Sequence, residues 1–239
     1  MKLLSKTLIP QSRVKLALAS AECPYIDGVE ILKVNVNPKI DSPISSHADV
    51  NVCVVEDTAF VSIEQAELTN SLKKIGMQVV EVGGLSTKYP YDSRLNVAVF
   101  GKNAILNPKT ADSQLVEHLK RKNFNLIFTP QGYSKCSTLP VNESAIITCD
   151  RSIEKAVLQS GIDCLYIQPN GIKLEGYDYG FIGGCGGLIS PKEMLFFGDI
   201  TKHRDYKKIE SYLSKYDVKI ITTSGSLVDL GSFLPICEC

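Results

Sequence analysis

An internal repeat is the feature that most constrains the fold of this chain, and its clearest copy spans residues 132–169. The copy opens on small and polar residues, and two short apolar runs at 139–141 and 145–148 predict strands. Asp150 then stands where a helix N-cap belongs, before apolar residues at helical spacing. A glycine ends that helix, and residues 162–167 form a third apolar run. The unit is therefore predicted to fold as strand, strand, helix and strand.

The same order of elements recurs along the chain, and further copies start near residues 43, 91 and 177. We place four units at 43–83, 91–130, 132–169 and 177–223. The two terminal pieces, 226–239 and 11–36, supply the strands of a fifth unit, in which residues 232–236 pair beside residues 14–19. One such unit cannot bury its apolar face alone, and a unit shared between the termini hides the sheet edges by closing a ring. We predict a single-domain, five-fold pseudo-symmetric α/β propeller of ββαβ units.

The charge balance and the cysteines limit the classes of function. The 239 residues carry 26 Lys and Arg against 26 Asp and Glu, so no basic surplus indicates a nucleic acid or an anionic membrane as partner. No apolar run is long enough for a membrane helix, and the apolar run in the first ten residues is too short for the core of a secretory signal. Cys53, Cys149 and Cys164 stand singly in apolar runs, which is typical of reduced core residues. We expect a soluble cytoplasmic protein, with its oligomeric state left open.

In a ring of five units, equivalent positions gather around the central axis. When the units are aligned at the start of their first strands, carboxylates, cations, amides and thiols occupy equivalent positions at or just before these starts. A purely structural scaffold would need only strand-forming residues there. Polar groups that converge on an axial pocket indicate a small-molecule site. The substrate-binding candidates are Arg94, Lys135, Asp92, Asn51, Asn96, Ser137, Gly184, Cys185, Asp229 and Ser232.

Cys136 is the candidate nucleophile, since the neighbouring Lys135 is expected to lower the thiol pKa and to make Cys136 the most reactive of the eight cysteines. His47 is the candidate base, and Asp49 or Asp92 would orient it. The catalytic set is therefore Cys136, His47 and Asp49. The alternatives are that Cys136 is only a small residue at a crowded strand start and that His47 only hydrogen-bonds its own loop.

Other readings of these residues concern anions and metals. Arg94 and Lys135 suit a substrate carboxylate, although they can also be solvated rim charges or, for Arg94, a partner of Asp49. Residues 183–187 are rich in glycine but lack the Gly-Lys-Ser/Thr ending of a phosphate-binding loop. Zinc could use Cys136, Cys185, His47 and Asp49, yet no CxxC or HxxxH spacing supports it. We therefore expect no metal and no cofactor. Residues 237–239 are predicted to be a frayed tail.

Four motifs, together with the repeat, resemble the pentein fold of the guanidino-group-modifying enzymes, and more narrowly a bacterial branch of it. The motifs are residues 47–49, 131–137, 177–184 and 229–232. The resemblance covers nearly the whole chain and implies the five-unit ring.

The resemblance does not carry the chemistry over unchanged. Those enzymes use a Cys at the start of the last unit's inner strand, where this chain has residues 231–234 without a Cys. They place a His before the matching strand of the fourth unit, where this chain has residues 181–185 and no His.

Two functions stay open. One is a Cys-dependent hydrolase or amidinotransferase-like enzyme, which acts on a small guanidino or amide compound with a carboxylate through a covalent thioether or thioester-like intermediate at Cys136. The other is a metabolite-binding module that has lost the superfamily's Cys and His.

Overall fold

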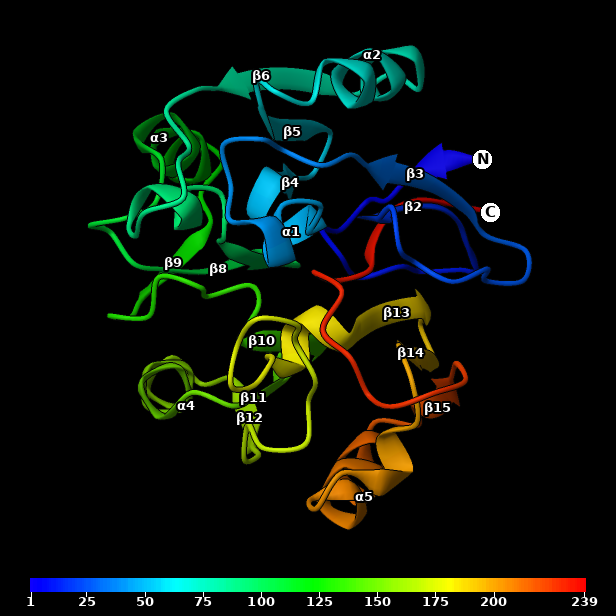
Figure 1. The fold of residues 1–239 in the computed structure, drawn as a ribbon. Coiled ribbons are helices and arrows are strands. Elements are labelled where there is room, and N and C mark those ends of the chain that lie inside the picture. The colour runs from blue at the N-terminus through cyan, green and yellow to red at the C-terminus, as the bar shows by residue number, and fades with distance from the viewer.

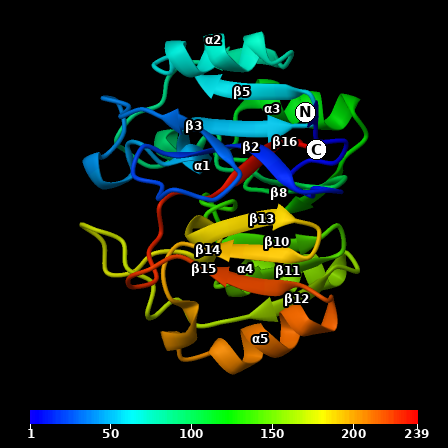
Figure 2. The same ribbon diagram turned by 90° about the vertical axis from the view of Figure 1, so that its right-hand side faces the viewer.

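Five small sheets surround a central axis in the computed structural model, which describes residues 1–239. In each sheet the inner strand pairs antiparallel with the middle strand, which pairs parallel with the outer strand. The helices of the repeated units lie on the outside of the ring, the short helix at residues 48–51 lies near its centre, and the two ends of the chain lie side by side (Figure 1). The view turned by 90° shows the strands of neighbouring units stacked around the axis (Figure 2). The predicted five-fold α/β propeller is confirmed.

Four units have the predicted order of strand, strand, helix and strand. The first contains β4 (Val52–Val55), β5 (Thr58–Ser62), α2 (Ala66–Lys74) and β6 (Gln78–Val82). The second contains β7 (Ala98–Phe100), β8 (Asn103–Leu106), α3 (Ser113–Arg121) and β9 (Asn125–Phe128). The third contains β10 (Thr138–Asn142), β11 (Ala145–Thr148), α4 (Arg151–Gln159) and β12 (Asp163–Tyr166). The fourth contains β13 (Gly186–Ser190), β14 (Glu193–Phe196), α5 (Tyr206–Lys215) and β15 (Lys219–Thr222).

Short helical turns join the units on the side that holds the candidate site. They are η1 (Ser42–Ile44), α1 (Ala48–Asn51), η2 (Tyr91–Ser93) and η3 (Ile182–Cys185), while a further turn, η4 (Ile200–Lys202), lies within the fourth unit between β14 and α5. Local chemistry explains where α4, the helix of the third unit, begins and ends. The Asp150 side chain accepts hydrogen bonds from the backbone N–H groups of Ser152 and Ile153, as predicted for an N-cap. Gly161 follows the helix at a φ of +76°, which favours glycine.

The fifth unit joins the two ends of the chain. Its sheet has the order β1 (Lys2–Leu3), β16 (Leu234–Glu238), β2 (Val14–Ser20) and β3 (Glu30–Val34). The predicted pairing is confirmed, because Leu234 lies opposite Leu18 and Pro235 opposite Ala17. The added strand β1, which pairs with the far edge of β16, was not predicted. A loop takes the place of the helix in this unit, and its strands β16 and β2 are each paired on both sides.

The C-terminal residues are part of this sheet, so the prediction of a frayed tail is wrong. Cys237 and Glu238 are buried in β16. One Glu238 carboxylate oxygen accepts hydrogen bonds from the backbone N–H groups of Gln11 at 2.6 Å and Ser12 at 2.8 Å. The carboxylate thus accepts hydrogen bonds from two N–H groups of the segment just before β2. It therefore holds the last strand of the chain against the first long one.

Replacing Glu238 with alanine is expected to lower the free energy of unfolding by about 2 to 3 kcal/mol, because the backbone N–H groups of Gln11 and Ser12 lose a charged, buried acceptor. Urea denaturation followed by circular dichroism measures this loss. Glu30→Ala, at an exposed position on β3 where the carboxylate has no partner, is the control and should change stability by no more than about 0.5 kcal/mol. Equal stability of the two variants would mean that Glu238 does not hold the closure.

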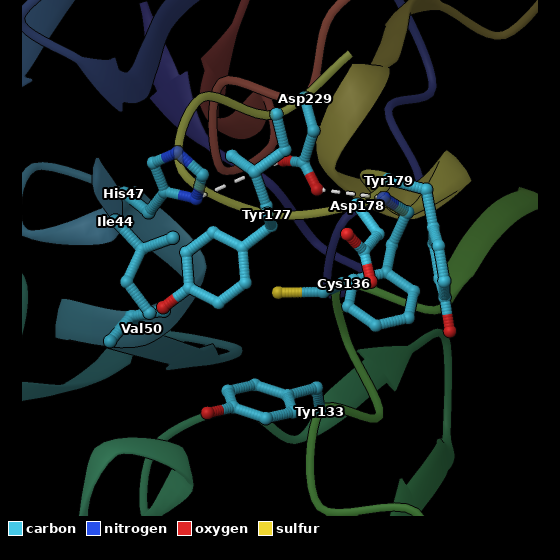
Figure 3. Close-up of a pocket in the computed structure, with 11 residues that line it drawn as sticks. Ile44, His47, Val50, Tyr133, Cys136, Tyr177, Asp178, Tyr179 and Asp229 are labelled. Carbon is cyan, nitrogen blue, oxygen red and sulfur yellow. Dashed lines mark hydrogen bonds and ion pairs between the residues drawn. The ribbon is translucent and has the colours of Figure 1, made fainter. Parts of the chain in front are cut away.

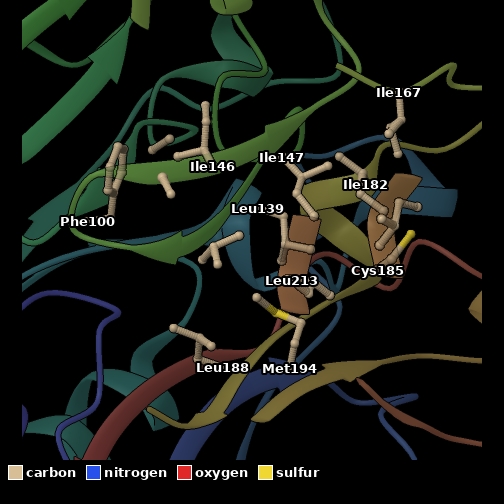
Figure 4. Packing of buried hydrophobic residues seen from close by; sticks show 14 of the residues in the cluster. Phe100, Leu139, Ile146, Ile147, Ile167, Ile182, Cys185, Leu188, Met194 and Leu213 are labelled. Carbon is tan, nitrogen blue, oxygen red and sulfur yellow. The ribbon is translucent and has the colours of Figure 1, made fainter. Parts of the chain in front are cut away.

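The apolar core lies between neighbouring sheets rather than on the axis. The largest cluster has 25 buried residues and fills the space among the second, third and fourth units. Leu139 and Ile147 of the third unit meet Ile182, and Met194 and Leu213 of the fourth, within this cluster (Figure 4). Three smaller clusters fill the remaining interfaces. Next to the candidate site, the axis is occupied by buried polar side chains, among them Lys135, Asp49 and Ser232. No helix in residues 1–239 has the length and apolar character that crossing a bilayer requires.

Candidate functional site

An aromatic-walled cavity of about 270 Å³ opens on the side of the ring that carries the short helical turns. The loops before β10, before η3 and before β16 meet there with η1 and α1 (Figure 3). We call this cavity the aromatic pocket. Its lining residues are Ile44, His47, Val50, Tyr133, Cys136, Leu174, Tyr177, Asp178, Tyr179, Phe181 and Asp229.

Cys136 lies in the turn before β10, and its sulfur is directed into the pocket near the rings of Tyr177 and Tyr133 (Figure 3). Asn96 holds this turn through both ends of its amide. Its Nδ2 atom donates to the Cys136 Sγ atom at 2.9 Å, while its Oδ1 atom accepts from the backbone N–H groups of Lys135 at 2.8 Å and Cys136 at 3.1 Å. Asn96, predicted as a substrate contact, therefore positions the candidate nucleophile in the structure.

The prediction that the Cys136 thiol has a lowered pKa is wrong for the free protein. Burial raises its pKa well above the ordinary value, and the carboxylates of Asp49 and Asp229 raise it further. The hydrogen bond from Asn96 and the charge of Lys135 act in the opposite direction but are weaker. The physical reason is that desolvation of a thiolate outweighs one nearby cation. Without a ligand, Cys136 is held as a neutral thiol.

His47 and Asp229 form a buried pair on the wall opposite Tyr133. The His47 Nδ1 atom lies 3.8 Å from the Asp229 Oδ1 atom, and both side chains are at most 5% exposed. Asp229 also accepts hydrogen bonds from the backbone N–H groups of Phe181 at 2.9 Å and Gly231 at 3.0 Å. Burial raises the pKa of Asp229, and the charge of His47 counteracts this. Asp229, and neither Asp49 nor Asp92, is therefore the carboxylate that faces the His47 ring.

Two glycines allow this pair to form. A Cβ atom on Gly184 would lie 1.8 Å from the Asp229 Oδ1 atom, so no larger residue fits there. Gly231 has a φ of +75°, and a Cβ atom on it would lie 2.3 Å from the His47 Cβ atom. Gly184, predicted as a substrate contact, instead makes room for the Asp229 carboxylate.

A second group of predicted residues forms a buried network on the axis, which we call the axial cluster: Lys135, Ser232 and Asp49. The Lys135 Nζ atom donates to the Ser232 hydroxyl at 2.8 Å and to the Gly183 carbonyl at 3.1 Å. The Ser232 hydroxyl also contacts the Asp49 carboxylate, whose other oxygen has no hydrogen-bond partner. Burial lowers the pKa of Lys135, and Asp49 opposes this. None of the three lines the aromatic pocket.

The other predicted residues lie away from the pocket lining. Arg94 forms an ion pair with Asp112 at 2.5 Å between Nη2 and Oδ2. The Asn51 amide donates to the carbonyls of Ser45 and His47, which shapes the turn before α1. Cys185 is fully buried in the core. The Ser137 hydroxyl is buried without a hydrogen-bond partner. No group of three or more His, Cys, Asp or Glu side chains in residues 1–239 is arranged to hold a metal ion.

Asp92 acts on the pocket through an aromatic residue. The Tyr133 hydroxyl donates to the Asp92 Oδ2 atom at 2.5 Å, and the other Asp92 oxygen is buried without a partner. Burial is the main cause of the raised pKa of Asp92, which the Tyr133 hydrogen bond opposes. The Tyr133 ring is thus fixed with its hydroxyl turned to Asp92 and its ring against the pocket.

The aromatic walls were not predicted as site residues. The rings of Tyr133 and Phe181 stack at 6.3 Å and 23°, and Tyr179 meets Phe181 edge-on at 5.8 Å. The Tyr177 hydroxyl donates to Asp41 at 2.7 Å, which ties the loop before η3 to η1. The signal in the sequence was the density of aromatics in residues 177–181. Aromatic faces and two aspartates, with no Lys or Arg in the lining, suit a cation.

Comparison with known proteins identifies the family. The model of the group described as "Family of unknown function (DUF6873)" matches residues 25–234. The chain belongs to this family. A search of curated proteins finds no match to this DUF6873 member.

Solved structures similar to this DUF6873 member share its fold at low sequence identity. An amidinotransferase of the saxitoxin pathway from Microseira wollei superposes with a TM-score of 0.62 at 10% identity, over 99% of this chain and 97% of that one. The inosamine-phosphate amidinotransferase of Streptomyces griseus gives 0.61 at 8% identity, over the same shares. Agmatine deiminase of C. jejuni gives 0.55 at 14% identity, over 93% of each chain. These are pentein proteins, so the predicted pentein fold is confirmed.

Proposed function

We propose that the aromatic pocket binds a small cation with a guanidinium group, and that Cys136 attacks the amidino carbon of this ligand. The protein would then be a Cys-dependent hydrolase or an amidinotransferase-like enzyme. The observation that carries the proposal is the Cys136 sulfur, which projects among aromatic rings and opposite the His47–Asp229 pair. The similar structures support the choice of a guanidino compound, because their names describe amidinotransferases and a deiminase.

The charges of the pocket refine the substrate that the sequence suggested. A substrate carboxylate was expected because of Arg94 and Lys135, but Arg94 pairs with Asp112 and Lys135 belongs to the axial cluster. The charged side chains that line the pocket are instead Asp178 and Asp229, with His47 beside them. We therefore propose a guanidino cation without a carboxylate close to the guanidinium.

The proposed reaction has two covalent steps. As the Cys136 sulfur bonds to the amidino carbon, the bond from that carbon to the departing amine breaks. The thiol proton leaves the sulfur and is delivered to the amine, with His47 as the candidate carrier. A water molecule or a second amine then forms a new bond to the carbon, the carbon–sulfur bond breaks, and the attacking group's proton returns to the sulfur.

A cationic ligand would supply the charge that the free site lacks. The Cys136 pKa is raised by burial and by two carboxylates, so the thiolate is disfavoured until a positive charge lies beside it. A bound guanidinium would provide that charge and lower the pKa. The thiolate would then form mainly in the complex, which keeps the free thiol unreactive.

A binding module without catalysis is the second candidate function. Two observations favour it: the pKa of Cys136 is raised, and the positions of the superfamily's catalytic Cys and His are occupied by other residues. Ser232, at the start of the last unit's inner strand, is enclosed in the axial cluster. Cys185 belongs to residues 181–185, the segment that corresponds to the superfamily's His, and it is buried in the core. In this alternative the aromatic pocket holds the same cation without reacting.

Calorimetric titration is expected to show that agmatine and methylguanidine bind more tightly than arginine, because the pocket lining has two aspartates and no Lys or Arg. Tyr133→Leu should weaken agmatine binding by about tenfold through the loss of a cation–π contact. Tyr25→Leu is the matched control, since Tyr25 is 85% exposed and lies outside the pocket. Intact-mass measurement after mixing should then find one amidino group on Cys136.

The outcomes separate the two candidates. Absence of binding for every guanidino compound would contradict both. Binding without a mass increase on Cys136, and without release of an amine, would leave the binding module.

A further inference from the structure

A second cavity, of about 540 Å³, adjoins the aromatic pocket and shares His47, Leu174 and Asp229 with it. We call it the polar cavity. The segment from Lys173 to Phe181 borders both spaces, since its first residues line the polar cavity and its later ones the aromatic pocket. The size is within the range of small-molecule sites. The chemistry of its walls differs from that of the aromatic pocket and points to a different ligand.

Three charged side chains of the polar cavity have no partner in the protein. Glu22, Lys173 and Glu175 are exposed and take part in no ion pair or side-chain hydrogen bond. Many other surface charges of this chain are paired, for example Lys102 with Glu56 and Lys208 with Asp205. Free charges of both signs around one cavity are complementary to a ligand that itself carries both signs.

The backbone fixes the position of Lys173 at this cavity. Its N–H donates to the Leu227 carbonyl at 3.0 Å, and its own carbonyl accepts from the Asp229 N–H at 2.9 Å. These bonds belong to an isolated bridge between Lys173 and Val228. The Lys173 ammonium is therefore carried by an ordered segment, although its side chain is exposed.

His47 supplies a buried polar group at the inner end of the cavity. It is only 4% exposed, and its ring makes no hydrogen bond within the protein. Nδ1 faces Asp229 at 3.8 Å, whereas Figure 3 shows the other ring nitrogen directed away from Cys136. This nitrogen belongs to a side chain that lines the cavity and has no hydrogen-bond partner in the protein, so it is free to bond a ligand or a water molecule.

We propose that the polar cavity is a separate binding site for a small zwitterion that carries a protonated amine and a carboxylate. Lys173 binds the carboxylate, Glu22 and Glu175 bind the ammonium group, and the ligand lies against His47. The site does not depend on the reaction at Cys136, and it stands if the proposed function fails. With both sites filled, the His47–Asp229 pair lies between a guanidino cation and an amino compound.

The test titrates the full-length protein with γ-aminobutyrate, and with butylamine and butyrate as probes that carry one charge each. Calorimetry gives the affinities, and the imidazole ¹⁵N signals of the three histidines report contact with His47. The zwitterion is expected to bind at least about tenfold more tightly than either single-charge probe and to shift only the His47 signals. Lys173→Met should weaken its binding by about tenfold or more, and Glu175→Gln by less.

Two control variants make the result decisive. Lys219→Met removes another exposed, unpaired lysine and should leave the affinity for γ-aminobutyrate unchanged. Tyr133→Leu alters the aromatic pocket alone and should also leave it unchanged. The proposal is overturned if no zwitterion binds, if Lys173→Met binds as well as wild type, if butylamine binds equally well, or if Tyr133→Leu abolishes the binding.

Discussion

Chloroacetamidine is expected to alkylate Cys136 at least about tenfold faster than chloroacetamide at neutral pH, although the two reagents differ only in charge and one heavy atom. The aromatic pocket should concentrate the cation between Tyr133 and Asp229. The cation also lowers the pKa of the Cys136 thiol, and each pKa unit changes the thiolate fraction tenfold while the thiol is mostly protonated. Peptide mapping by mass spectrometry, with time points for each reagent, measures the two rates.

The pH dependence gives a second readout of the same prediction. Because burial raises the pKa of Cys136, alkylation by the neutral reagent should increase only above the ordinary thiol range of about 8.5. Alkylation by the cationic reagent should begin at lower pH. Exposed Cys239 is the internal control and should show a much smaller preference between the reagents. Equal rates of the two reagents at Cys136 would rule out a cation-dependent thiolate.

Replacing Lys135 with methionine is expected to lower the free energy of unfolding by about 3 to 5 kcal/mol. The change removes the cation of the axial cluster and leaves the Asp49 carboxylate buried without a positive charge nearby. Urea denaturation followed by circular dichroism measures the loss. Lys219→Met, at an exposed position on β15, should cost no more than about 0.5 kcal/mol.

A double variant shows whether the cost comes from the unpaired charge. Asp49→Asn in the Lys135→Met background removes the remaining carboxylate charge, so the double variant should be more stable than the sum of the two single changes predicts. Strict additivity would mean that Lys135 and Asp49 do not interact. A loss below about 1 kcal/mol in Lys135→Met would mean that the ammonium group is not needed in the axial cluster.

Much of the fold could be predicted because its signals are local and repeated. Asp150 caps α4 through a contact with the next turn, and the pairing of β16 with β2 followed from the likeness of residues 232–236 to residues 137–141. The strand β1 could not be predicted, since two residues carry no periodicity. The burial of Glu238 depends on N–H groups at the other end of the chain.

The site was predicted only in part because alignment of repeats gives a position around the axis but no side-chain direction. Cys136 and His47 both line the aromatic pocket. Arg94 instead turns outward to Asp112, the N-cap of the next helix, and Lys135 turns to Ser232 from the last unit. The direction of the Cys136 pKa was mistaken because sequence shows the neighbouring lysine but not the burial. The aromatic walls stand in loops, where no periodic signal exists.

The closure of the ring also governs the order in which the chain can acquire its structure. Strand β2 begins at Val14, yet its inner neighbour β16 begins only at Leu234. Each of the other four units can form its sheet from a continuous stretch of chain. During translation β2 therefore has one side unpaired until residues 234–238 have been synthesised, and contacts so distant in sequence form slowly. The fifth sheet, which joins residues 2–34 to residues 234–238, is therefore expected to be the last of the five sheets to assemble.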